Sequence, residues 1–328
     1  MKTEGIPREE AAAVVVGAGP AGLGAALGLA RRGVKPLVVL ERWPEAGGVP
    51  ARYPSRPPAP PTYVLYTRGR VVRGPEFVGP ILEKAQAAGA EIRLETAVLE
   101  VNLEERSLLV VHPEKGRYRL EAEALVFATG AREETAGERG WIAGARTGRL
   151  FHTMQFLEFL RRGGRPGWKR PVLAGSDLVS FSAAAELGVS GAEEVRMVDL
   201  PPRPRASLAA RLYFRRWVKP GWTGAKGATV RDAGGGEMVL DLEGGPPVRG
   251  DALFLSGVLV PNSELLAGAG APVDPGSRLL LDARGTALSS KGCFAAGNLL
   301  GGNHGGQWCF FSGLGAAKAA ARFLRSGN

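Results

Sequence analysis

Residues 11–41 are AAAVVVGAGPAGLGAALGLARRGVKPLVVLE. The first six form an apolar run of strand length, residues 20–32 have the composition of an Ala- and Leu-rich helix, and residues 36–40 form a second apolar strand. Neither strand alternates apolar with polar residues, which is typical of parallel strands buried on both faces. The stretch therefore predicts a β-α-β unit and an α/β fold.

A glycine-rich turn of the form G-x-G-x-x-G joins the first strand to the helix. Gly17 permits the tight turn, Gly19 lets the backbone approach a pyrophosphate, and Gly22 lets the helix pack closely on the strand. The helix N-terminus favours an anion there. Glu41 lies 19 residues after Gly22, where a carboxylate accepts hydrogen bonds from ribose hydroxyls. The motif predicts a dinucleotide site, for NAD or FAD, formed by Gly17, Gly19, Pro20, Ala21, Gly22 and Glu41.

The size and composition of the chain are those of a globular protein with about two domains. It has 328 residues, of which 45% are apolar, 23% are charged and 48 are glycine. No apolar run reaches the roughly 18 residues of a membrane-spanning helix, and the first residues, MKTEGIPREE, lack a signal-peptide pattern. We therefore expect a cytoplasmic protein without a transmembrane segment. The sequence leaves open whether the chain forms a homo-oligomer.

Cysteine and histidine are scarce in this chain. The two cysteines, Cys293 and Cys309, form neither a disulfide framework nor a Cys-x-x-Cys pair. The three histidines are widely separated, so we expect no metal site.

The net charge of +10 is concentrated in one segment, residues 200–231, which holds eight Lys or Arg and no acid. Leu208, Leu212 and Trp217 follow a near-helical spacing, which predicts an amphipathic basic helix over residues 207–218. This helix presents either a solvated face or a docking surface for an acidic partner or a membrane. We expect no nucleic-acid binding, because no motif that reads nucleic acid is present.

A second β-α-β pattern occupies residues 171–199, about 155 residues after the first, and suggests two related nucleotide-binding halves. The six prolines of residues 49–61 predict an extended loop. Further strands are expected at residues 91–101, 107–112, 118–120, 125–128, 228–230, 238–242, 252–255 and 293–296, and further helices at residues 76–88 and 310–324.

Five ordered motifs follow Glu41: Gly47-Gly48, residues 127–131 (FATGA), Gly257 to Asn262, residues 294–298 (FAAGN) and Gly301-Gly302. Together they resemble the two-dinucleotide-domain flavoproteins related to thioredoxin and glutathione reductase, the pyridine nucleotide-disulfide oxidoreductase-like proteins. The resemblance covers essentially the whole chain. It implies an FAD-binding Rossmann-like domain, residues 1–155 and 251–328, with an inserted, smaller NAD-like α/β domain, residues 156–250.

The resemblance also implies which residues hold noncovalent FAD. Beyond the first turn and Glu41, these are Arg42, Gly48, Val98, Ala128, Thr129, Gly130, Gly297 and Asn298. Asn298 stands where the family has an aspartate, and an amide keeps an acceptor for a ribityl hydroxyl while removing a negative charge beside the pyrophosphate. The helix that begins near Trp308 would direct its N-terminus at the flavin.

The second half departs from the family pattern. Ala174, Ser176 and Val179 occupy the three glycine positions of the NAD(P)H fingerprint, and the acidic Asp177 lies where a pyrophosphate would bind. Asp199 is placed as in an NAD-type ribose site, but one acid does not replace three glycines. NAD(P)H binding is therefore doubtful. The redox cysteine pair of the family is also absent, so we expect no disulfide reductase activity.

A narrower resemblance involves residues 128–133, 144–148, 151–153 and 180–183. These segments are similar to the FAD-carrying subunits of multi-subunit amine and amino-acid dehydrogenases or oxidases, including proline, sarcosine, opine and hydrogen cyanide-forming types. This likeness implies a small-molecule amine or amino-acid donor. It also implies that electrons pass to a partner subunit or a quinone.

His304 and Cys309 are the candidate catalytic residues, because they lie between Asn298 and the last helix. His304 serves as a base or substrate contact, or is an ordinary loop residue. Cys309 is a thiolate stabilised by the helix, or a small buried apolar residue. The favoured function is an FAD-dependent dehydrogenase. The alternatives are an NAD(P)H-dependent flavin reductase without a redox disulfide and a non-catalytic flavin-bearing relay or scaffold subunit.

Overall fold

A computed structural model describes residues 5–53, 63–64, 71–139, 142–143, 148–222, 224–225, 227–282, 288 and 290–327. The chain divides into two compact units. Unit 1 comprises Met1–Ala51, Tyr63–Arg132 and Val260–Asn328, and unit 2 comprises Arg52–Thr62 and Glu133–Leu259. The inserted unit is therefore longer than the expected range of residues 156–250. The strands β9 (Ala131–Glu133) and β19 (Leu259–Pro261), at its two ends, pair with each other.

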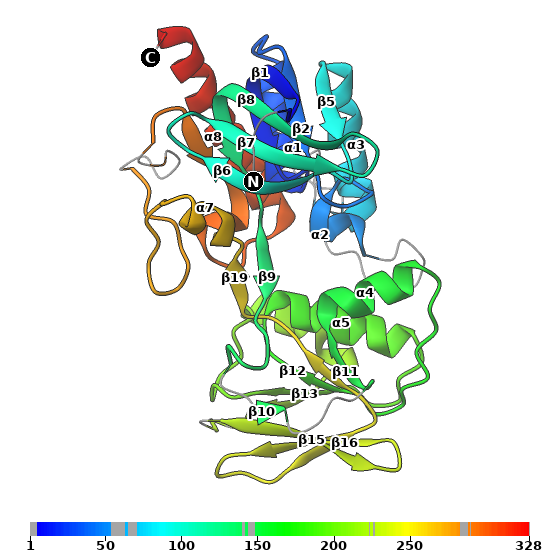
Figure 1. The fold of residues 1–328 in the computed structure, drawn as a ribbon. Coiled ribbons are helices and arrows are strands. Elements are labelled where there is room, and N and C mark those ends of the chain that lie inside the picture. Colours follow the sequence, from blue (N-terminus) through cyan, green and yellow to red (C-terminus); the bar gives the residue numbers. More distant parts are fainter. Residues whose placement is uncertain are drawn as a thin grey trace. The chain divides into compact units, whose positions relative to one another are not determined.

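Unit 1 is built on a seven-stranded sheet with the order β5-β2-β1-β8-β7-β6, in which β20 also pairs with β8 (Figure 1). The pairs β5-β2, β2-β1, β1-β8 and β8-β20 are parallel, whereas β8-β7 and β7-β6 are antiparallel. The strands are β1 (Arg8–Val16), β2 (Leu37–Leu40), β5 (Ala90–Arg93), β6 (Ala97–Asn102), β7 (Ser107–His112), β8 (Gly116–Phe127) and β20 (Cys293–Ala295). A two-stranded ribbon, β3 (Tyr63–Val64) and β4 (Val71–Val72), is separate.

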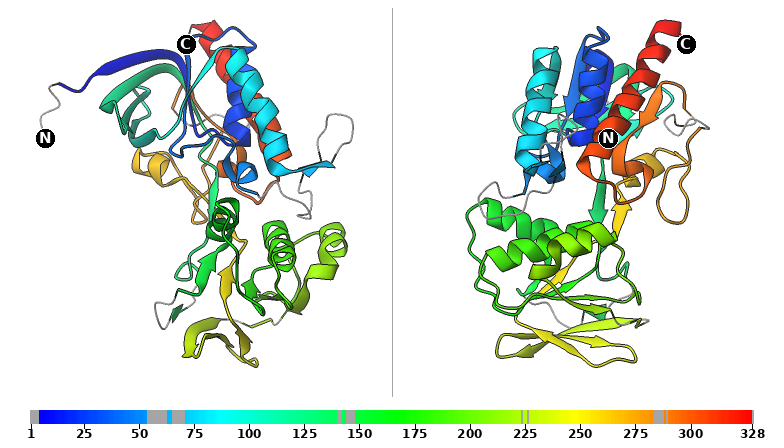
Figure 2. Two further views of the ribbon diagram at one scale, coloured as in Figure 1. Left: turned by 90° about the vertical axis from the view of Figure 1, so that its right-hand side faces the viewer. Right: turned by 180° about the vertical axis from the view of Figure 1, so that it is seen from behind.

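Three helices cover one face of this sheet: α1 (Pro20–Ala30), α3 (Gly74–Ala87) and α8 (Gly306–Ser326). They lie side by side in Figure 2. Glycines let α1 and α8 approach closely, because a β-carbon at Gly24 would lie 2.3 Å from the Phe310 carbonyl oxygen. One at Gly313 would lie 1.9 Å from the Ala21 oxygen. Short helices, α2 (Gly48–Ala51) and α7 (Glu264–Gly268), and a 3-10 helix (Gly297–Leu300) complete the unit.

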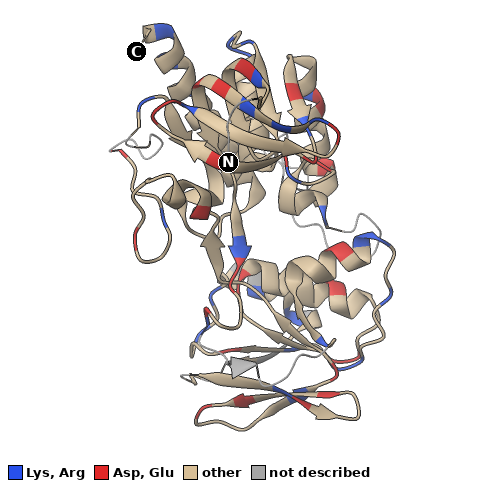
Figure 3. Cartoon of the chain, in the orientation of Figure 1, with Lys and Arg blue, Asp and Glu red and all other residues tan. Residues whose placement is uncertain are grey.

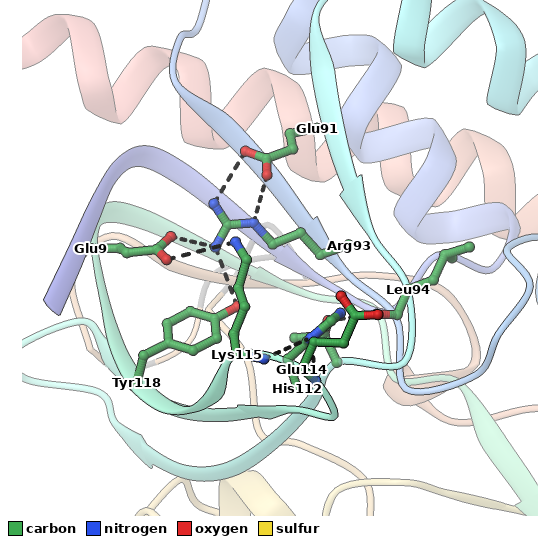
Figure 4. A network of polar contacts seen from close by, with 9 residues as sticks. Glu9, Glu91, Arg93, Leu94, His112, Glu114, Lys115 and Tyr118 are labelled. Atoms are coloured by element: carbon green, nitrogen blue, oxygen red, sulfur yellow. Dashed lines mark hydrogen bonds and ion pairs between the residues drawn. The ribbon is translucent and has the colours of Figure 1, made fainter. Parts of the chain in front are cut away.

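A network of polar contacts fastens the edge strand β5 to the rest of the sheet (Figure 4). The Arg93 guanidinium donates to Glu91 at 2.8 Å, to Glu9 of β1 at 2.5 Å and to the Tyr118 hydroxyl of β8 at 3.2 Å. Only 13% of the Arg93 side chain is exposed. Its hydrogen bond to Glu91 lowers the pKa of that carboxyl. The network therefore joins three strands through one cation.

Unit 2 has three layers (Figure 1). Its central parallel sheet has the order β11-β18-β12-β13-β14 and is covered on one face by α4 and α5 and on the other by the sheet β10-β15-β16-β17. The strands are β10 (Ile142–Ala143), β11 (Leu150–His152), β12 (Val172–Ala174), β13 (Arg196–Asp199), β14 (Lys219–Trp222), β15 (Ala228–Gly234), β16 (Glu237–Leu242), β17 (Val248–Gly250) and β18 (Leu253–Leu255). The helices are α4 (Thr153–Arg161), α5 (Leu178–Val189) and α6 (Leu208–Phe214).

Four local expectations need correction. The strand expected at residues 91–101 is two strands, β5 and β6. The strands predicted at residues 118–120 and 125–128 are parts of one 12-residue strand, β8, which pairs with β1 along its length. The helix predicted over residues 207–218 is shorter: α6 ends at Phe214 and a 3-10 turn, Arg215–Trp217, follows. The loop predicted over residues 49–61 begins as α2. Residues 54–61 of that loop, and residues 144–147 of the narrower resemblance, lie outside the described residues.

Candidate functional site

The turn between β1 and α1 requires glycine at the positions that the motif predicts. Gly17 has a φ of +100°, and a β-carbon there would lie 2.5 Å from the Ala128 carbonyl oxygen. A β-carbon at Gly22 would lie 1.7 Å from the Gly17 oxygen. These contacts bring the Ala128 end of β8 against the turn and allow α1 to begin directly beside β1. The sequence folds here as a dinucleotide-binding turn.

The N-terminus of α1 is surrounded by small residues. Its N-cap is Gly19, and the first turn of the helix contains no acidic side chain. A β-carbon at Gly19 would meet only the Gly48 Cα, at 3.8 Å, and one at Gly297 would lie 2.6 Å from the Ala21 Cβ. Glycines from three parts of the chain therefore leave the backbone N–H groups of this helix end accessible. Such a helix end binds a phosphate or pyrophosphate.

Glu41 lies at the end of β2, as the ribose interpretation requires. Its side chain is buried, with 6% exposure, and accepts hydrogen bonds from the N–H groups of Ala18 at 2.8 Å and Trp43 at 3.1 Å. A carboxylate has further acceptor capacity, which is available to a ribose hydroxyl. The Thr96 N–H donates to the Glu41 carbonyl at 2.8 Å, so the segment that leads to Val98 runs beside this residue.

Arg42, the neighbour of Glu41, is exposed, and its guanidinium carbon lies 5.7 Å from the centre of the Trp43 ring.

The Ala128-Thr129-Gly130 turn is fixed by Asn262. The Thr129 hydroxyl donates to the Asn262 carbonyl at 2.9 Å, and the Asn262 amide donates to the Thr129 carbonyl at 2.8 Å. The Asn262 N–H donates to the Gly130 carbonyl at 3.0 Å. Two motifs far apart in the sequence thus form one rigid turn at the end of β8, next to Gly17.

Asn298 closes a loop of the C-terminal segment. Its amide nitrogen donates to the His304 carbonyl at 3.1 Å, and its amide oxygen accepts the His304 N–H at 3.0 Å. No sequence pattern indicated these two contacts. The amide oxygen retains a second lone pair, so its contact with a ribityl hydroxyl stays a prediction.

The structure brings the two candidate catalytic residues together at the start of α8. The exposed His304 ring stacks on Trp308, with 3.8 Å between ring centres. Cys309 is buried, with 6% exposure, and its Sγ lies 3.7 Å from the His304 carbonyl oxygen. Burial raises the pKa of the Cys309 thiol to about 11. At neutral pH this group is therefore a thiol rather than a thiolate nucleophile, and the catalytic roles of both residues stay predictions.

Two functional candidates were missed at the sequence level, Glu133 and Arg139. Glu133 lies three residues after Gly130 of the Ala-Thr-Gly motif, is 7% exposed and accepts the Met154 N–H at 3.2 Å. Burial raises the pKa of its carboxyl to about 7. Arg139 is buried at the ends of β12 and β18. Its sequence position, 35 residues before Ala174, carried no indication of this placement.

Comparison with known proteins identifies the family. Residues 11–321 match the model of the pyridine nucleotide-disulphide oxidoreductases. The chain belongs to this family. Members of the family are FAD-dependent oxidoreductases, and FAD is the cofactor of the chain. Which residues hold it stays a prediction, although the glycine-lined end of α1 and the buried Glu41 fit a dinucleotide. Among the helices of the described residues, none has the length and apolarity to cross a membrane.

The fold of this family member matches the crystal structure of T. acidophilum thioredoxin reductase with a TM-score of 0.75. The sequence identity is 20%, and the match covers 97% of this chain and 98% of that one. Two curated relatives are more similar in sequence. They are an opine oxidase subunit of Rhizobium meliloti, 30% identical over 190 residues, and the hydrogen cyanide synthase subunit HcnB of Pseudomonas aeruginosa, 34% identical over 130 residues.

These two matches cover 57% and 39% of this chain, and 38% and 26% of the respective relatives. The chain therefore spans well under half the length of either curated relative.

Proposed function

We propose that this chain is an FAD-dependent dehydrogenase subunit that oxidises a small amine- or amino-acid-type donor and passes the electrons to a partner protein or a quinone. The observation that carries the proposal is the state of the two cysteines. Both are free and buried, Cys293 in β20 and Cys309 in α8. A disulfide reductase needs a pair of cysteines that can join, and this chain has no further cysteine.

The relatives support an organic donor. One belongs to an opine oxidase and the other belongs to hydrogen cyanide synthase. In the proposal the turn at Gly17, Gly19 and Gly22 binds the pyrophosphate of FAD, Glu41 accepts from its ribose, and His304 contacts the substrate. FAD supplies the redox chemistry when bound, and the protein orients the reactants.

Anaerobic titration tests the proposal. We expect proline, sarcosine, glycine or an opine-type secondary amine to bleach the visible absorbance of the FAD-loaded chain. NADH and NADPH serve as parallel donors. Rapid stoichiometric bleaching by micromolar NADH would overturn the proposal in favour of a flavin reductase. The absence of bleaching by every donor would favour a relay or scaffold role.

We also propose that the partner docks on α6 of unit 2. Leu208 and Leu212 are 61% and 55% exposed, and Arg203 and Arg215 are exposed nearby in the sequence. Figure 3 shows positive and negative residues interspersed over unit 1, whereas residues 200–231 contain no acid. An apolar and basic surface fits an acidic partner with exposed apolar side chains.

Binding to immobilised poly-glutamate tests the charge of this surface. We expect Arg203→Glu/Arg215→Glu to weaken binding at least tenfold at low salt. The control Arg117→Glu/Arg325→Glu makes the same change of charge at exposed residues of unit 1. Equal loss in both variants would contradict a localised docking surface.

A further inference from the structure

The carboxyl ends of β12, β13 and β18 form the place where a dinucleotide would bind in unit 2. After β12 the chain continues to β13 on one side, and β18 lies on the other side. Ligands of open parallel sheets bind outside the strand ends at such a change of direction. The turn after β12 lies tightly against β18, because a β-carbon at Gly175 would be 1.9 Å from the Ser256 carbonyl oxygen.

The Asp177 carboxylate lies at the N-terminus of α5, where the phosphates of a dinucleotide would bind. Asp177 is the N-cap of this helix, but its side chain makes no capping hydrogen bond to it. Its carboxylate instead accepts the Val258 N–H at 2.6 Å, and a β-carbon at Gly257 would lie 2.5 Å from its Oδ2. The buried carboxylate occupies the electrostatic environment that a pyrophosphate would require. A ligand phosphate at this point would meet a fixed negative charge.

An internal cation fills the space between the strand ends. The Arg139 guanidinium donates to the carbonyls of Ala174 at 3.0 Å, Ser256 at 2.8 Å and Gly257 at 3.0 Å. Only 6% of this side chain is exposed. These carbonyls end β12 and follow β18, so the guanidinium bridges the ends of these two paired strands. Displacing it would remove one donor from each of these three carbonyl oxygens.

The ribose position is occupied as well. The carboxylate of Asp199, at the end of β13, accepts the Ser176 hydroxyl and, at 2.9 Å, the Leu200 N–H. Ser176 in turn accepts the Arg205 N–H at 3.0 Å on its hydroxyl and the Ala206 N–H at 2.8 Å on its carbonyl. Residues 205–206 therefore lie against the turn that a nucleotide would need to approach.

Unit 1 shows the opposite arrangement at the equivalent turn. The structure corrects the expected register by one residue, because Gly17, Gly19 and Gly22 correspond to Gly175, Asp177 and Ser180 rather than to Ala174, Ser176 and Val179. There the N-cap is Gly19, the first turn of α1 has no acid, and the nearest atom to a β-carbon at the N-cap is the Gly48 Cα.

We infer that the dinucleotide site of unit 2 is closed by its own residues, with Asp177 and Arg139 in the place of NAD(P)H. The residues present do not fit a nicotinamide dinucleotide. The first fingerprint glycine is kept as Gly175, whereas the second is replaced by Asp177, whose carboxylate acts with the Arg139 guanidinium to hold the ends of β12 and β18 together. The inference concerns binding alone and does not depend on the proposed donor.

Titration calorimetry and NADH fluorescence test the closure on the FAD-loaded chain. We expect no binding of NADH or NADPH to the wild type up to millimolar concentration. The variant Arg139→Ala/Asp177→Ala removes both internal charges and should bind at least tenfold more tightly than the wild type. The matched control, Ser180→Gly, restores the glycine that corresponds to Gly22 of unit 1 but keeps both charges, and should resemble the wild type.

Micromolar binding of NADH to the wild type would overturn the inference. A gain of NADH binding in the glycine control alone would also overturn it. The sequence of the turn, rather than the internal charges, would then decide whether NADH reaches the site. Asp177→Asn serves if the double variant fails to fold, since its amide oxygen can still accept the Val258 N–H. It should bind more tightly than the wild type, and unchanged affinity would contradict the role of the carboxylate.

Discussion

Gly19 decides whether a pyrophosphate reaches the backbone of α1. Its φ of −74° is accessible to every residue. Chain neighbours aside, the Gly48 Cα is the described atom that a β-carbon there would meet within 4 Å. Gly19→Val should therefore fold normally yet lose at least a hundredfold in FAD affinity, because the added methyl groups occupy the phosphate position. Flavin content after purification measures the effect. Gly315→Val, at an exposed position of α8, should retain full flavin. Equal flavin content in the two variants would refute the assignment of Gly19 to the pyrophosphate site.

Asn298 combines a predicted contact with FAD and an observed loop closure. Asn298→Ala removes the two hydrogen bonds with His304 and the acceptor proposed for the ribityl chain. We expect a loss of about 1–3 kcal/mol in FAD binding, or roughly tenfold to a hundredfold in affinity. Asn298→Asp should be milder, since a carboxylate can still accept the His304 N–H. The FAD dissociation constants test this, and equally tight binding by the Ala variant would exclude contact with the cofactor.

Glu133 should make the stability of the protein depend on pH. Burial raises its pKa from 4.5 to about 7. Between these values the folded protein holds a proton that the unfolded chain releases, so the free energy of unfolding decreases as the pH rises through this window. The decrease is up to about 3 kcal/mol and ends above pH 7. Glu133→Gln should remove it, as urea unfolding at pH 5 and pH 8 will measure. If the free energy of unfolding changed equally between pH 5 and pH 8 in the wild type and in Glu133→Gln, the raised pKa would be contradicted.

At the scale of elements, the Arg93 side chain connects the edge strand β5 to β1 and β8, in addition to the backbone pairing of β5 with β2. Arg93→Met removes the cation shared by Glu9, Glu91 and Tyr118 (Figure 4). We expect a decrease of about 1–3 kcal/mol in the free energy of unfolding, because a mostly buried guanidinium loses charge-assisted hydrogen bonds. Chemical denaturation gives the value. Arg117→Met, at an exposed residue of β8, should change the free energy of unfolding by less than about 0.5 kcal/mol. A decrease as large as that of Arg93→Met would show that the effect is not specific to the network.

Helix α6 shows where an amphipathic pattern differs from the structure. The spacing of Leu208, Leu212 and Trp217 predicted one apolar face, yet both leucines are exposed. Phe214 is buried, and Trp217 packs beside Gly188 of α5. The helix ends before Trp217, so the three side chains do not share one helical face. A pattern that assumes a continuous helix cannot anticipate where the helix ends.

At the scale of the whole molecule, the purified chain should contain noncovalent FAD. The buried Glu41 is placed for an adenosine ribose, which FMN lacks. Denaturation should release FAD into solution, and chromatography will distinguish it from FMN. Added FAD should also raise the melting temperature of the apoprotein, because a ligand that binds only the folded state stabilises it. Release of FMN, or flavin that stays attached to the denatured chain, would contradict the prediction.

The sequence by itself determined the first dinucleotide turn. Gly17 and Gly22 are required by local backbone sterics, and the apolar strands on either side have the period of buried parallel strands, so neighbouring residues carry the information. The sequence also showed that the second fingerprint lacks glycines, but its register was assigned one residue too early, since Gly175 is the first glycine and Asp177 and Ser180 stand at the other two positions. What closes that site was decided only by the tertiary structure. Arg139 reaches Ala174, and Asp177 reaches Val258, because β12 and β18 are neighbours in the sheet although they are distant in the sequence.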